Sequence, residues 1–416
     1  MDLNLDLDRN VPVLDWEPHL SSRTAGMGSS AIRELLKLTQ QPDIISFAGG
    51  LPAPDFFPLR EVEEACRYIV REDGRQALQY SATEGHGPLK EYLAESMRGY
   101  GVPAKAHNVL LTNGSQQALD LIGKIFIDPG DYVLTSRPTY LGAIQAWNAY
   151  EARYHTVRLD DDGMVADEIE HAYQKALDDS GRPPKFIYVL PNFHNPAGTT
   201  LVQERREQLA EVATELSLPV VEDDPYGQLR YEGDDLPPIC TYVPERTIYL
   251  GTFSKILAPG LRLGWIVCPE ILMGRFVQAK QGADLHTGTF VQYVANDICQ
   301  RGFLKQHVKE LREVYKVRRD TMLDALTEFW PDVCSWTRPQ GGLFLWAQVP
   351  QAIDTRDLLE QALEEKVAYV PGVPFYPNED GGYDAMRLNF SYSSPETIVE
   401  GIRRLGRALK KALDQV

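Results

Sequence analysis

Six short runs of apolar residues, separated by stretches of helical composition, constrain the fold most strongly. The runs are NVLLT (108–112), YVLTS (132–136), KFIYVLP (185–191), LPVVEDD (218–224), TIYLGTF (247–253) and LGWIV (263–267). The apolar residues in each run are continuous, which is typical of strands covered on both faces. Alternation of such strands with helices predicts an α/β fold with a mainly parallel sheet between helices.

The pattern changes near residue 303. A long charged helical stretch (303–329) is followed by the strand-like GGLFLWAQV (341–349), a helix near 355–365, the strand-like MRLNFSYS (386–393) and a last helix at 395–412. We therefore expect a large domain at 56–302 and a smaller α+β domain at 303–416. The N-terminal segment 1–55, with an amphipathic helix in SSAIRELLKLT (29–39), is too short to fold alone. We expect it to pack on the smaller domain or to reach across the mouth of the sheet.

The net charge argues against two classes of partner. The chain has 42 Lys and Arg residues against 59 Asp and Glu residues, a formal net charge of −17. We therefore expect no general affinity for nucleic acid or membranes, so an anionic substrate needs a local basic site. The five cysteines are scattered, with no C-x-x-C pair, which indicates neither a disulfide framework nor a thiolate metal site. The sequence has neither a signal-peptide pattern nor a membrane-spanning apolar run, so we expect a cytoplasmic protein.

Polar residues follow several of the apolar runs, at the strand ends where open α/β sheets bind ligands. After the first run, NGSQQ (113–117) opens a helix, and a small-residue turn at a helix N-terminus suits a phosphate. Ser115 is equally well explained as an ordinary N-cap, and Gln116 follows it. No complete nucleotide-binding glycine motif is present.

The next strand ends carry groups that suit a planar ligand. Tyr140, in RPTYLGA, either covers such a ligand or belongs to the core, and Asn195, in NFHNPAGT, offers both a donor and an acceptor or is part of a turn. Asp223 and Tyr226 lie three residues apart in EDDPYG, where a carboxylate can face a protonated ring nitrogen and a phenol a ring oxygen. The alternatives are a solvated loop or a metal site, for which His194 is the nearest histidine in the pattern.

Lys255 lies in GTFSKILAPGLRLGW (251–265), which has no acidic residue and one further cation, Arg262. A lysine that reaches solvent from a turn is the ordinary interpretation. A lysine desolvated in an electropositive pocket instead loses its proton easily and can condense with a carbonyl group. Together, these turns describe a planar, phosphorylated ligand with a basic ring nitrogen and an aldehyde, which is pyridoxal phosphate.

Eight segments in a fixed order carry a resemblance to a known family. They are SFAGGLPAPDFFP, QYSATEGHGPLK, NGSQQALDL, NFHNPAGT, VVEDDPYG, GTFSKILAPGLRLGW, QAKQGADLHT and MRLNFS. The chain resembles, over nearly its whole length, the fold-type I pyridoxal-phosphate aminotransferases of class I. Within them it is similar to the 2-aminoadipate and aromatic aminotransferase subgroup, which includes kynurenine aminotransferase II and the lysine-biosynthesis enzyme.

The resemblance implies roles for residues around the cofactor ring. Lys255 matches the Schiff-base lysine, and Asp223 matches the carboxylate that keeps the pyridine nitrogen protonated. Tyr226 and Asn195 match the partners of the ring hydroxyl, and Tyr140 matches the ring stacked on the cofactor. We expect Asp223 to stay ionised and nearby cations to lower the pKa of Lys255, which then moves the proton between the substrate Cα and the cofactor.

Further roles concern the phosphate, the substrate and a second subunit. The residues that match the phosphate cup are Ser115, Gln116, Thr252, Ser254 and Arg262. Arg387 matches the arginine that binds the substrate α-carboxylate, assisted by Asn195 and the backbone at Gly50. Tyr80 matches a tyrosine that reaches the neighbouring subunit's phosphate, which implies a homodimer with shared sites. Arg23 matches an arginine that meets a distal substrate carboxylate, or else is a solvated charge.

The implied reaction moves the α-amino group of 2-aminoadipate, an aromatic or a leucine-like amino acid to 2-oxoglutarate, giving a 2-oxo acid and glutamate. One alternative is a lyase or decarboxylase that uses the same cofactor on the same fold. The other is a regulator that carries an aminotransferase-like domain behind a DNA-binding head. The charge of −17 and the roughly 20 residues before Arg23 argue against a regulator.

Overall fold

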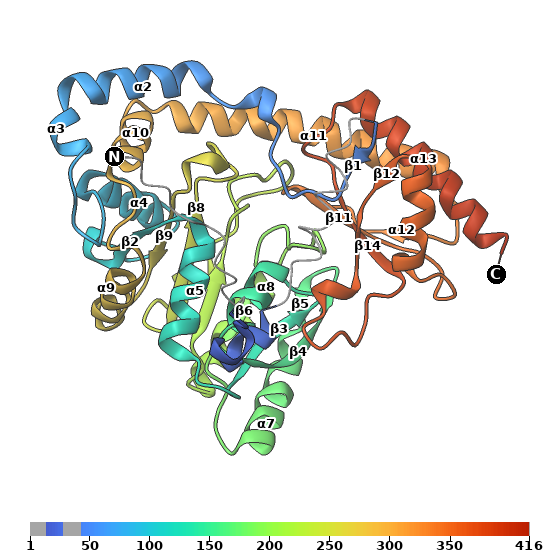
Figure 1. Ribbon diagram of the computed structural model, residues 1–416, viewed down its shortest axis with the longest axis horizontal. Helices are drawn as coiled ribbons and strands as arrows, with labels where there is room; N and C mark the ends of the chain where they lie inside the picture. The colour runs from blue at the N-terminus through green and yellow to red at the C-terminus, as the bar shows by residue number, and fades with distance from the viewer. Residues whose placement is uncertain (1–13, 28–42, 416) are drawn as a thin grey trace, which may run out of the picture.

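The computed structural model describes residues 14–27 and 43–415 (Figure 1). The amphipathic helix expected at 29–39 lies outside these residues. Within them the chain forms an eight-stranded sheet, a four-stranded sheet and a two-stranded pair. No helix in the described part of the chain combines the length and apolarity that a membrane span requires.

The eight-stranded sheet is mainly parallel, as the apolar runs predict. Its strands are β2 (Val109–Thr112), β3 (Tyr132–Arg137), β4 (Arg153–Asp160), β5 (Gly163–Met164), β6 (Ile187–Val189), β7 (Val220–Asp223), β8 (Thr247–Thr252) and β9 (Gly264–Val267), in the order β2-β9-β8-β7-β6-β3-β4-β5. Neighbours from β8 to β4 are parallel, whereas β9 is antiparallel to both β2 and β8. The apolar runs did not predict β4, which lies near the sheet edge and has mostly exposed or half-buried residues.

Helices cover both faces of this sheet, which confirms the predicted helical layers. They are α2 (Leu59–Glu72), α3 (Gly74–Ala77), α4 (Gly87–Gly99), α5 (Gly114–Phe126), α6 (Leu141–Asn148), α7 (Ile169–Ser180), α8 (Gln203–Glu215), α9 (Glu270–Asp284) and α10 (Thr289–Gln300). Side chains alternate between faces along each strand. In β2, Leu110 joins the hydrophobic cluster of α5, α6 and α9, while Val109 and Leu111 join that of α2, α4 and α10. Toward β3 and β6 the second face packs on α7 and α8.

The four-stranded sheet is antiparallel and lies in the C-terminal part. Its order is β10-β11-β14-β13, and the elements there are α11 (Phe303–Phe329), β10 (Ser335–Trp336), β11 (Phe344–Gln348), α12 (Thr355–Glu364), β12 (Val367–Ala368), β13 (Val370–Pro371), β14 (Ala385–Asn389) and α13 (Pro395–Leu413). The long helix α11 runs along one side of the molecule and packs on both α10 and α13 (Figure 1). Strand β1 (Ile45–Ser46) pairs with β12, so the N-terminal segment contacts this part of the chain. The domain boundaries at 55/56 and 302/303 stay predictions.

Candidate active site

One cavity of about 360 Å³ collects nearly all the candidate residues at the carboxyl ends of the strands. The candidates that line it are Gly50, Ser115, Gln116, Tyr140, Asn195, Asp223, Tyr226, Thr252, Ser254, Lys255, Arg262 and Arg387. Leu190, Pro225, Pro259 and Phe344 also line it and were not predicted. These four are apolar, so no feature of their local sequence separates them from core residues.

Lys255 follows β8, and its amine lines the cavity without an acidic partner among the described residues. Its Nζ donates a hydrogen bond to the backbone oxygen of Gly50 at 2.8 Å, and no carboxylate of the described residues pairs with it. Burial, followed by the nearby charges of Arg387 and Arg262, lowers the pKa of Lys255 to about 8. The expected lowering is therefore confirmed, but burial contributes more than the neighbouring cations.

Side chains alternate along a strand, so Glu222 and Asp224, at the end of β7, point away from the side on which Asp223 lies. Glu222 accepts backbone hydrogen bonds from Ile239 and Cys240, at 2.8 and 2.9 Å. Asp224 accepts hydrogen bonds from the Asn192 side chain, the Gly227 backbone and the Tyr249 hydroxyl. Each of these two carboxylates is thus satisfied by the protein.

Asp223, by contrast, lines the cavity with one oxygen free. Its Oδ2 accepts a hydrogen bond from the Tyr188 hydroxyl at 2.7 Å, whereas Oδ1 is buried with no partner among the described residues. Burial raises the pKa of Asp223 to about 7. Without a ligand, this carboxyl group is therefore partly protonated near neutral pH, whereas the sequence predicts that it stays ionised. A cation placed against Oδ1 would lower this pKa again, and a protonated ring nitrogen is such a cation.

Arg387, on β14, is a second cation without an acidic partner among the described residues. Its side chain is buried, with Nη1 donating to Asn195 Oδ1 at 2.9 Å and Nη2 to the Ala48 oxygen at 2.7 Å. Phe344 and Phe375 lie against the guanidinium, 4.3 and 5.1 Å from ring centroid to Cζ. Its Nε has no partner, and burial lowers the pKa of Arg387 to about 10. Such a planar fork, removed from water, suits a carboxylate ligand.

The opposite end of the cavity is formed by the start of α5. Asn113 is the N-cap and the helix begins at Gly114, with φ of 73°, so the interpretation of Ser115 as the N-cap is wrong. A Cβ at Gly114 would lie 2.8 Å from Arg262 Nη2, and one at Gly264 would lie 2.8 Å from the Ser115 nitrogen. Small residues therefore let the helix N-terminus and the Arg262 side chain approach each other, and that combination suits a phosphate.

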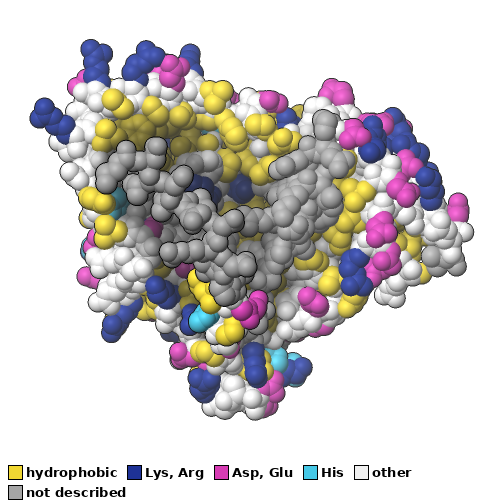
Figure 2. Space-filling model, viewed as in Figure 1, with side chains coloured by type: hydrophobic (Ala, Val, Ile, Leu, Met, Phe, Trp, Pro, Cys, Tyr) yellow, Lys and Arg dark blue, Asp and Glu magenta, His cyan; other side chains and the backbone are white. Residues whose placement is uncertain are grey.

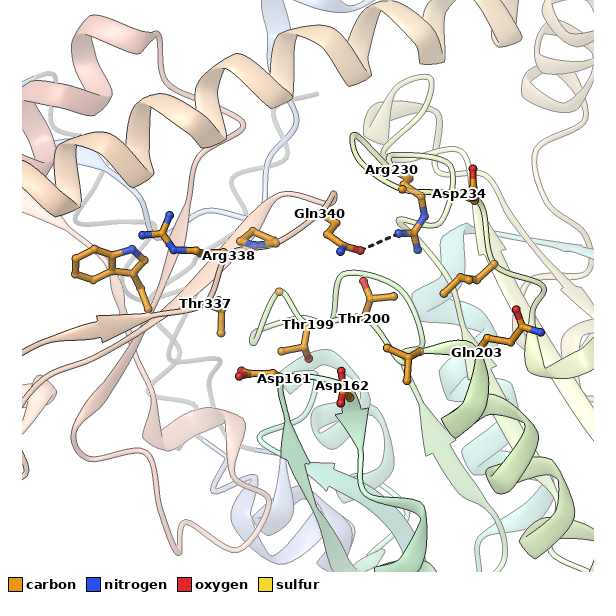
Figure 3. Close-up of a pocket in the computed structure, with 16 residues that line it drawn as sticks. Asp161, Asp162, Thr199, Thr200, Gln203, Arg230, Asp234, Thr337, Arg338 and Gln340 are labelled. Atoms are coloured by element: carbon orange, nitrogen blue, oxygen red, sulfur yellow. Dashed lines mark hydrogen bonds between the residues drawn. The ribbon is translucent and has the colours of Figure 1, made fainter.

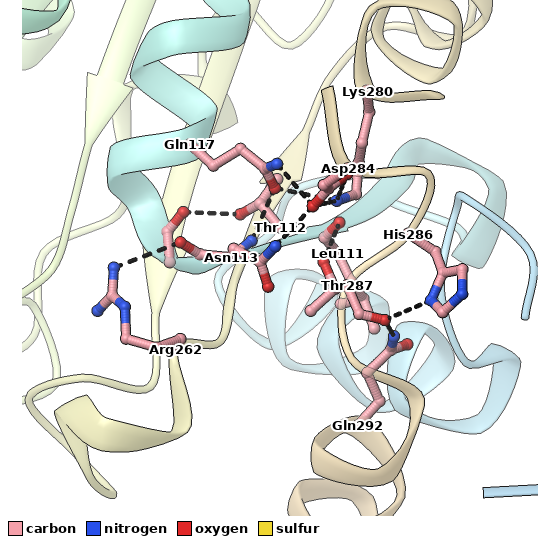
Figure 4. A network of polar contacts seen from close by, with 11 residues as sticks. Leu111, Thr112, Asn113, Gln117, Arg262, Lys280, Asp284, His286, Thr287 and Gln292 are labelled. Carbon is pink, nitrogen blue, oxygen red and sulfur yellow. Dashed lines mark hydrogen bonds and ion pairs between the residues drawn. The ribbon is translucent and has the colours of Figure 1, made fainter. Parts of the chain in front are cut away.

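A partly buried polar network supports the start of α5 (Figure 4). Lys280 Nζ donates to both carboxylate oxygens of Asp284, at 2.8 and 2.7 Å, and to Gln117 Oε1 at 2.9 Å. Asp284 Oδ2 also accepts from Asn113 Nδ2 at 2.6 Å and from Gln117 Nε2 at 2.7 Å. These contacts fix the residue that caps α5. The local sequence does not predict these contacts, because Lys280 and Asp284 have the i,i+4 spacing of an ordinary helical ion pair.

His194 connects the loop after β6 to strand β3, and both of its ring nitrogens are taken up by hydrogen bonds within the protein. Its Nδ1 accepts a hydrogen bond from the Ala197 backbone at 3.3 Å, and its Nε2 lies 3.0 Å from Ser136 Oγ. Burial lowers the pKa of His194 to about 3, so the ring is neutral and donates from Nε2 to Ser136. The described residues contain no group of His, Cys, Asp and Glu that could hold a metal ion.

Two candidate residues lie outside the cavity. Arg23 is exposed in the short 3₁₀ helix η2 (Ser22–Gly26). Burial and Asp120 raise the pKa of Tyr150 to about 12, and the nearby charge of Arg23 opposes that rise. Tyr80 is 78% exposed, and its ring packs edge-on against His286 at a centroid distance of 5.6 Å. Their roles toward substrate and neighbouring subunit stay predictions.

Comparisons with known proteins agree with this chemistry. The sequence profile described as aminotransferase class I and II matches residues 43–405. The aromatic-amino-acid aminotransferase 1 of Thermococcus litoralis is 46% identical over 97% of this chain and 97% of its own length. The 2-aminoadipate transaminase of Thermus thermophilus is 42% identical over 96% of this chain and 98% of its own. The crystal structure of a Thermus thermophilus α-aminoadipate aminotransferase complexed with N-(5'-phosphopyridoxyl)-L-leucine has a TM-score of 0.90 and 41% identity, over 97% of this chain and 100% of that chain.

The cavity fits pyridoxal phosphate at both ends. The buried, unpartnered Asp223 Oδ1 suits a protonated ring nitrogen, and the N-terminus of α5 suits a phosphate. Lys255 lies in the same cavity with a lowered pKa, as an amine that must form a covalent link to an aldehyde requires. The chain therefore belongs to the class I and II aminotransferases, enzymes that transfer amino groups of amino acids with pyridoxal phosphate as cofactor.

Proposed function

We propose that the enzyme moves the α-amino group of 2-aminoadipate, of an aromatic or of a leucine-like amino acid to 2-oxoglutarate. The products are a 2-oxo acid and glutamate, formed in two half-reactions with ping-pong kinetics. The proposal is carried by Lys255 and Arg387, two cations without acidic partners among the described residues that line one cavity. The range of donors is supported by relatives named for 2-aminoadipate and aromatic amino acids, and by the leucine adduct in the Thermus structure.

Each group around the ring then has a distinct task. Bound pyridoxal phosphate withdraws electrons from the substrate Cα. Lys255 Nζ removes the Cα proton, and a pKa of about 8 makes this amine an effective base near neutral pH. Arg387 binds the α-carboxylate with Asn195 beside it, while ionised Asp223 pairs with the ring nitrogen. Tyr226 and Asn195 bind the ring hydroxyl, and Tyr140 covers one face of the ring.

The phosphate and the distal end of the substrate involve the remaining candidates. We assign the phosphate to Ser115, Gln116, Thr252, Ser254 and Arg262, all of which line the cavity. Arg23 would meet the distal carboxylate of acidic substrates and move aside for apolar ones. Replacing Arg23 by Ala should therefore raise the KM for 2-aminoadipate and glutamate about tenfold, the order expected for loss of one charge-assisted hydrogen bond to a carboxylate. The KM for phenylalanine and leucine should stay unchanged, and an equal rise for all four substrates would contradict the role.

A donor panel with 2-oxoglutarate as acceptor tests the proposal. The panel contains 2-aminoadipate, tyrosine, phenylalanine, leucine, kynurenine and aspartate, with glutamate and the matching 2-oxo acid measured as products. A strong preference for aspartate alone would overturn the donor range. Release of ammonia or carbon dioxide without glutamate would favour the lyase or decarboxylase, and no turnover with any donor would favour the regulator.

We also propose a homodimer in which Tyr80 reaches the neighbouring subunit's phosphate. Exposed apolar side chains support it: Leu59, Tyr68 and Val70 on α2, with Leu78 nearby, are each at least 47% exposed. Figure 2 shows hydrophobic side chains gathered over the region of α2 and α10. Light scattering after gel filtration measures the oligomeric state. A monomer at micromolar concentration would contradict the proposed homodimer. The cytoplasmic location and a place in lysine biosynthesis also stay predictions.

A further inference from the structure

A second cavity, of about 570 Å³, lies between the two larger sheets (Figure 3). The loop after β6 contributes Thr199 and Thr200 to its wall, and the turn between β10 and β11 contributes Gln340. Arg230, from the segment after β7, lies across the cavity from the β4–β5 turn, which contributes Asp161 and Asp162. None of these residues lines the cofactor cavity.

The wall of this cavity contains buried polar atoms without partners. Thr199 Oγ1, Thr200 Oγ1 and Arg230 Nη2 are all buried and form no hydrogen bond with the described residues. Orphaned buried polar atoms are uncommon in folded proteins, because each costs the full desolvation of the group. The cofactor cavity shows the same feature at Asp223 Oδ1 and Arg387 Nε, where a ligand is expected to supply the missing partners.

Arg230 is held in place so that one nitrogen remains available. Its side chain is only 4% exposed, its Nη1 donates to Gln340 Oε1 at 3.2 Å, and its Nε lies 3.9 Å from Asp235 Oδ1. The guanidinium carbon lies 4.8 Å from the centre of the Phe193 ring. A guanidinium fixed on these sides loses little conformational entropy when Nη2 binds a ligand.

The wall carries charges of both signs: Arg230 and Arg338, and Asp161, Asp162 and Asp234, of which Asp234 lies beside Arg230 (Figure 3). In Figure 3 the two threonines lie between Arg230 and the pair Asp161 and Asp162. A ligand that pairs both with the unpartnered donors of Arg230 and the threonines and with Asp161 and Asp162 therefore carries an anionic group and a cationic group. We propose that this cavity is a second binding site for a free α-amino acid. Its carboxylate accepts hydrogen bonds from Arg230 Nη2 and the two threonine hydroxyls, and its ammonium group donates to the aspartates.

The position of the cavity connects it to the cofactor site. Thr199 and Thr200 belong to the same loop as Asn195, which binds Arg387. In that loop, a Cβ on Gly198 would lie 2.7 Å from the Phe344 oxygen, and the Phe344 ring packs on Arg387. An amino acid in the second cavity should therefore shift the KM of substrates that depend on Arg387.

Calorimetric titration of the borohydride-reduced holoenzyme with glutamate and with leucine tests the proposal. Reduction fixes the cofactor to Lys255, so no amino group is transferred during the titration. We compare the wild type, the double variant Thr199→Val/Thr200→Val, Arg387→Met, and Thr327→Val as a matched control on α11. Thr327 donates its hydroxyl to the Leu323 oxygen within its own helix, and it lines neither cavity.

The wild type and the control should bind two amino acids per chain. The threonine double variant should lose about tenfold or more in affinity at one site and keep the other, because charge-assisted hydrogen bonds are removed. Arg387→Met should show the reverse pattern. Two unchanged sites in the double variant, or binding that depends on Arg387 alone, would overturn the proposal.

Two measurements separate loss of binding from loss of folding. Without amino acid, the double variant should melt at the same temperature as the wild type or higher, because valine replaces an unpaired buried hydroxyl. Saturating amino acid should raise the melting temperature of both variants, because each keeps one site, but by less than it raises that of the wild type. A crystal structure of the reduced enzyme with glutamate that shows only water in the second cavity would also overturn the proposal.

Discussion

The two ends of the cofactor cavity are built from different groups. At the ring end, Asp223 and Arg387 are buried charges, and Lys255 has a pKa that burial lowers to about 8. At the phosphate end, the ligand meets a helix N-terminus, the hydroxyls of Thr252 and Ser254, and an exposed Arg262. The contacts made by the Arg262 guanidinium are to the backbone oxygens of Asn113 and Pro259, both at 3.4 Å.

This difference determines how each end should respond to mutation. In a medium of low dielectric, one unpaired charge interacts strongly with its ligand, so removing it should have a large effect. The phosphate end distributes its binding over backbone N–H groups and hydroxyls, each of which contributes little. We therefore expect nearly complete losses at the ring end and graded losses at the phosphate end.

Replacing Lys255 by Ala should have the largest effect. Loss of the proton-transferring amine should lower the rate of a single half-reaction by about 10³-fold or more. Stopped-flow absorbance after mixing the holoenzyme with glutamate measures that rate. Lys305→Ala, which removes an exposed lysine from α11, is the control and should leave it unchanged. A loss of less than tenfold would mean that another base serves the ring end.

Replacing Asp223 by Asn should lower activity by about 100-fold while stabilising the apoenzyme at pH 8. In the folded apoenzyme the pKa of Asp223 is raised from 3.8 to about 7, so the folded state binds more protons between these values. Ionisation of the buried Asp223 therefore lowers the free energy of unfolding. This loss is absent below pH 3.8, is complete above pH 7, and amounts to at most about 4 kcal/mol.

Thermal melting of the apoenzyme at pH 5 and pH 8 measures this cost. The wild type should be less stable at pH 8, and Asp223→Asn should reduce the difference. Some difference should remain, because burial also raises the pKa of Glu222 to about 7. If the variant melts like the wild type at both pH values, Asp223 is not the isolated buried carboxylate described above.

Replacing Arg387 by Lys keeps the charge but removes the planar fork. We expect kcat/KM to fall by about 100-fold through KM, because a lysine cannot bind the α-carboxylate in a bidentate manner. The absorbance spectrum of the bound cofactor should not change. Arg407→Lys is the matched control, since Arg407 forms a half-exposed surface pair with Glu365. If Arg387→Lys and Arg407→Lys had similar kcat/KM values, the distinction between buried and surface charges would not hold.

The sequence predicted the elements whose cause is local. Continuous apolar runs indicated the buried strands, and the polar residues that follow them, such as Asp223 and Lys255, could be placed at one edge of the sheet. Contacts made across the fold could not be predicted in this way. Tyr188 donates to Asp223 from within an apolar run, and Phe344 packs on Arg387 from another strand. Lys280 and Asp284 look like an ordinary helical pair until the fold places Asn113 beside them.

Replacing Gly114 by Ala should have the smallest effect and tests the phosphate end. The new Cβ meets Arg262 Nη2 at 2.8 Å in a backbone conformation with φ of 73°, so the guanidinium must move away from the phosphate. We expect the affinity for pyridoxal phosphate, measured by titrating the apoenzyme, to fall about tenfold, with kcat unchanged at saturating cofactor.

Gly130→Ala separates strain from contact. Gly130 also has a positive φ, of 83°, but nothing lies within 4 Å of its added Cβ. Both variants should therefore lose about 1 kcal/mol of stability, and only Gly114→Ala should lose cofactor affinity. If Gly114→Ala instead abolished activity at saturating cofactor, the phosphate end would be as sensitive to a single group as the ring end, and the contrast between the two ends would fail.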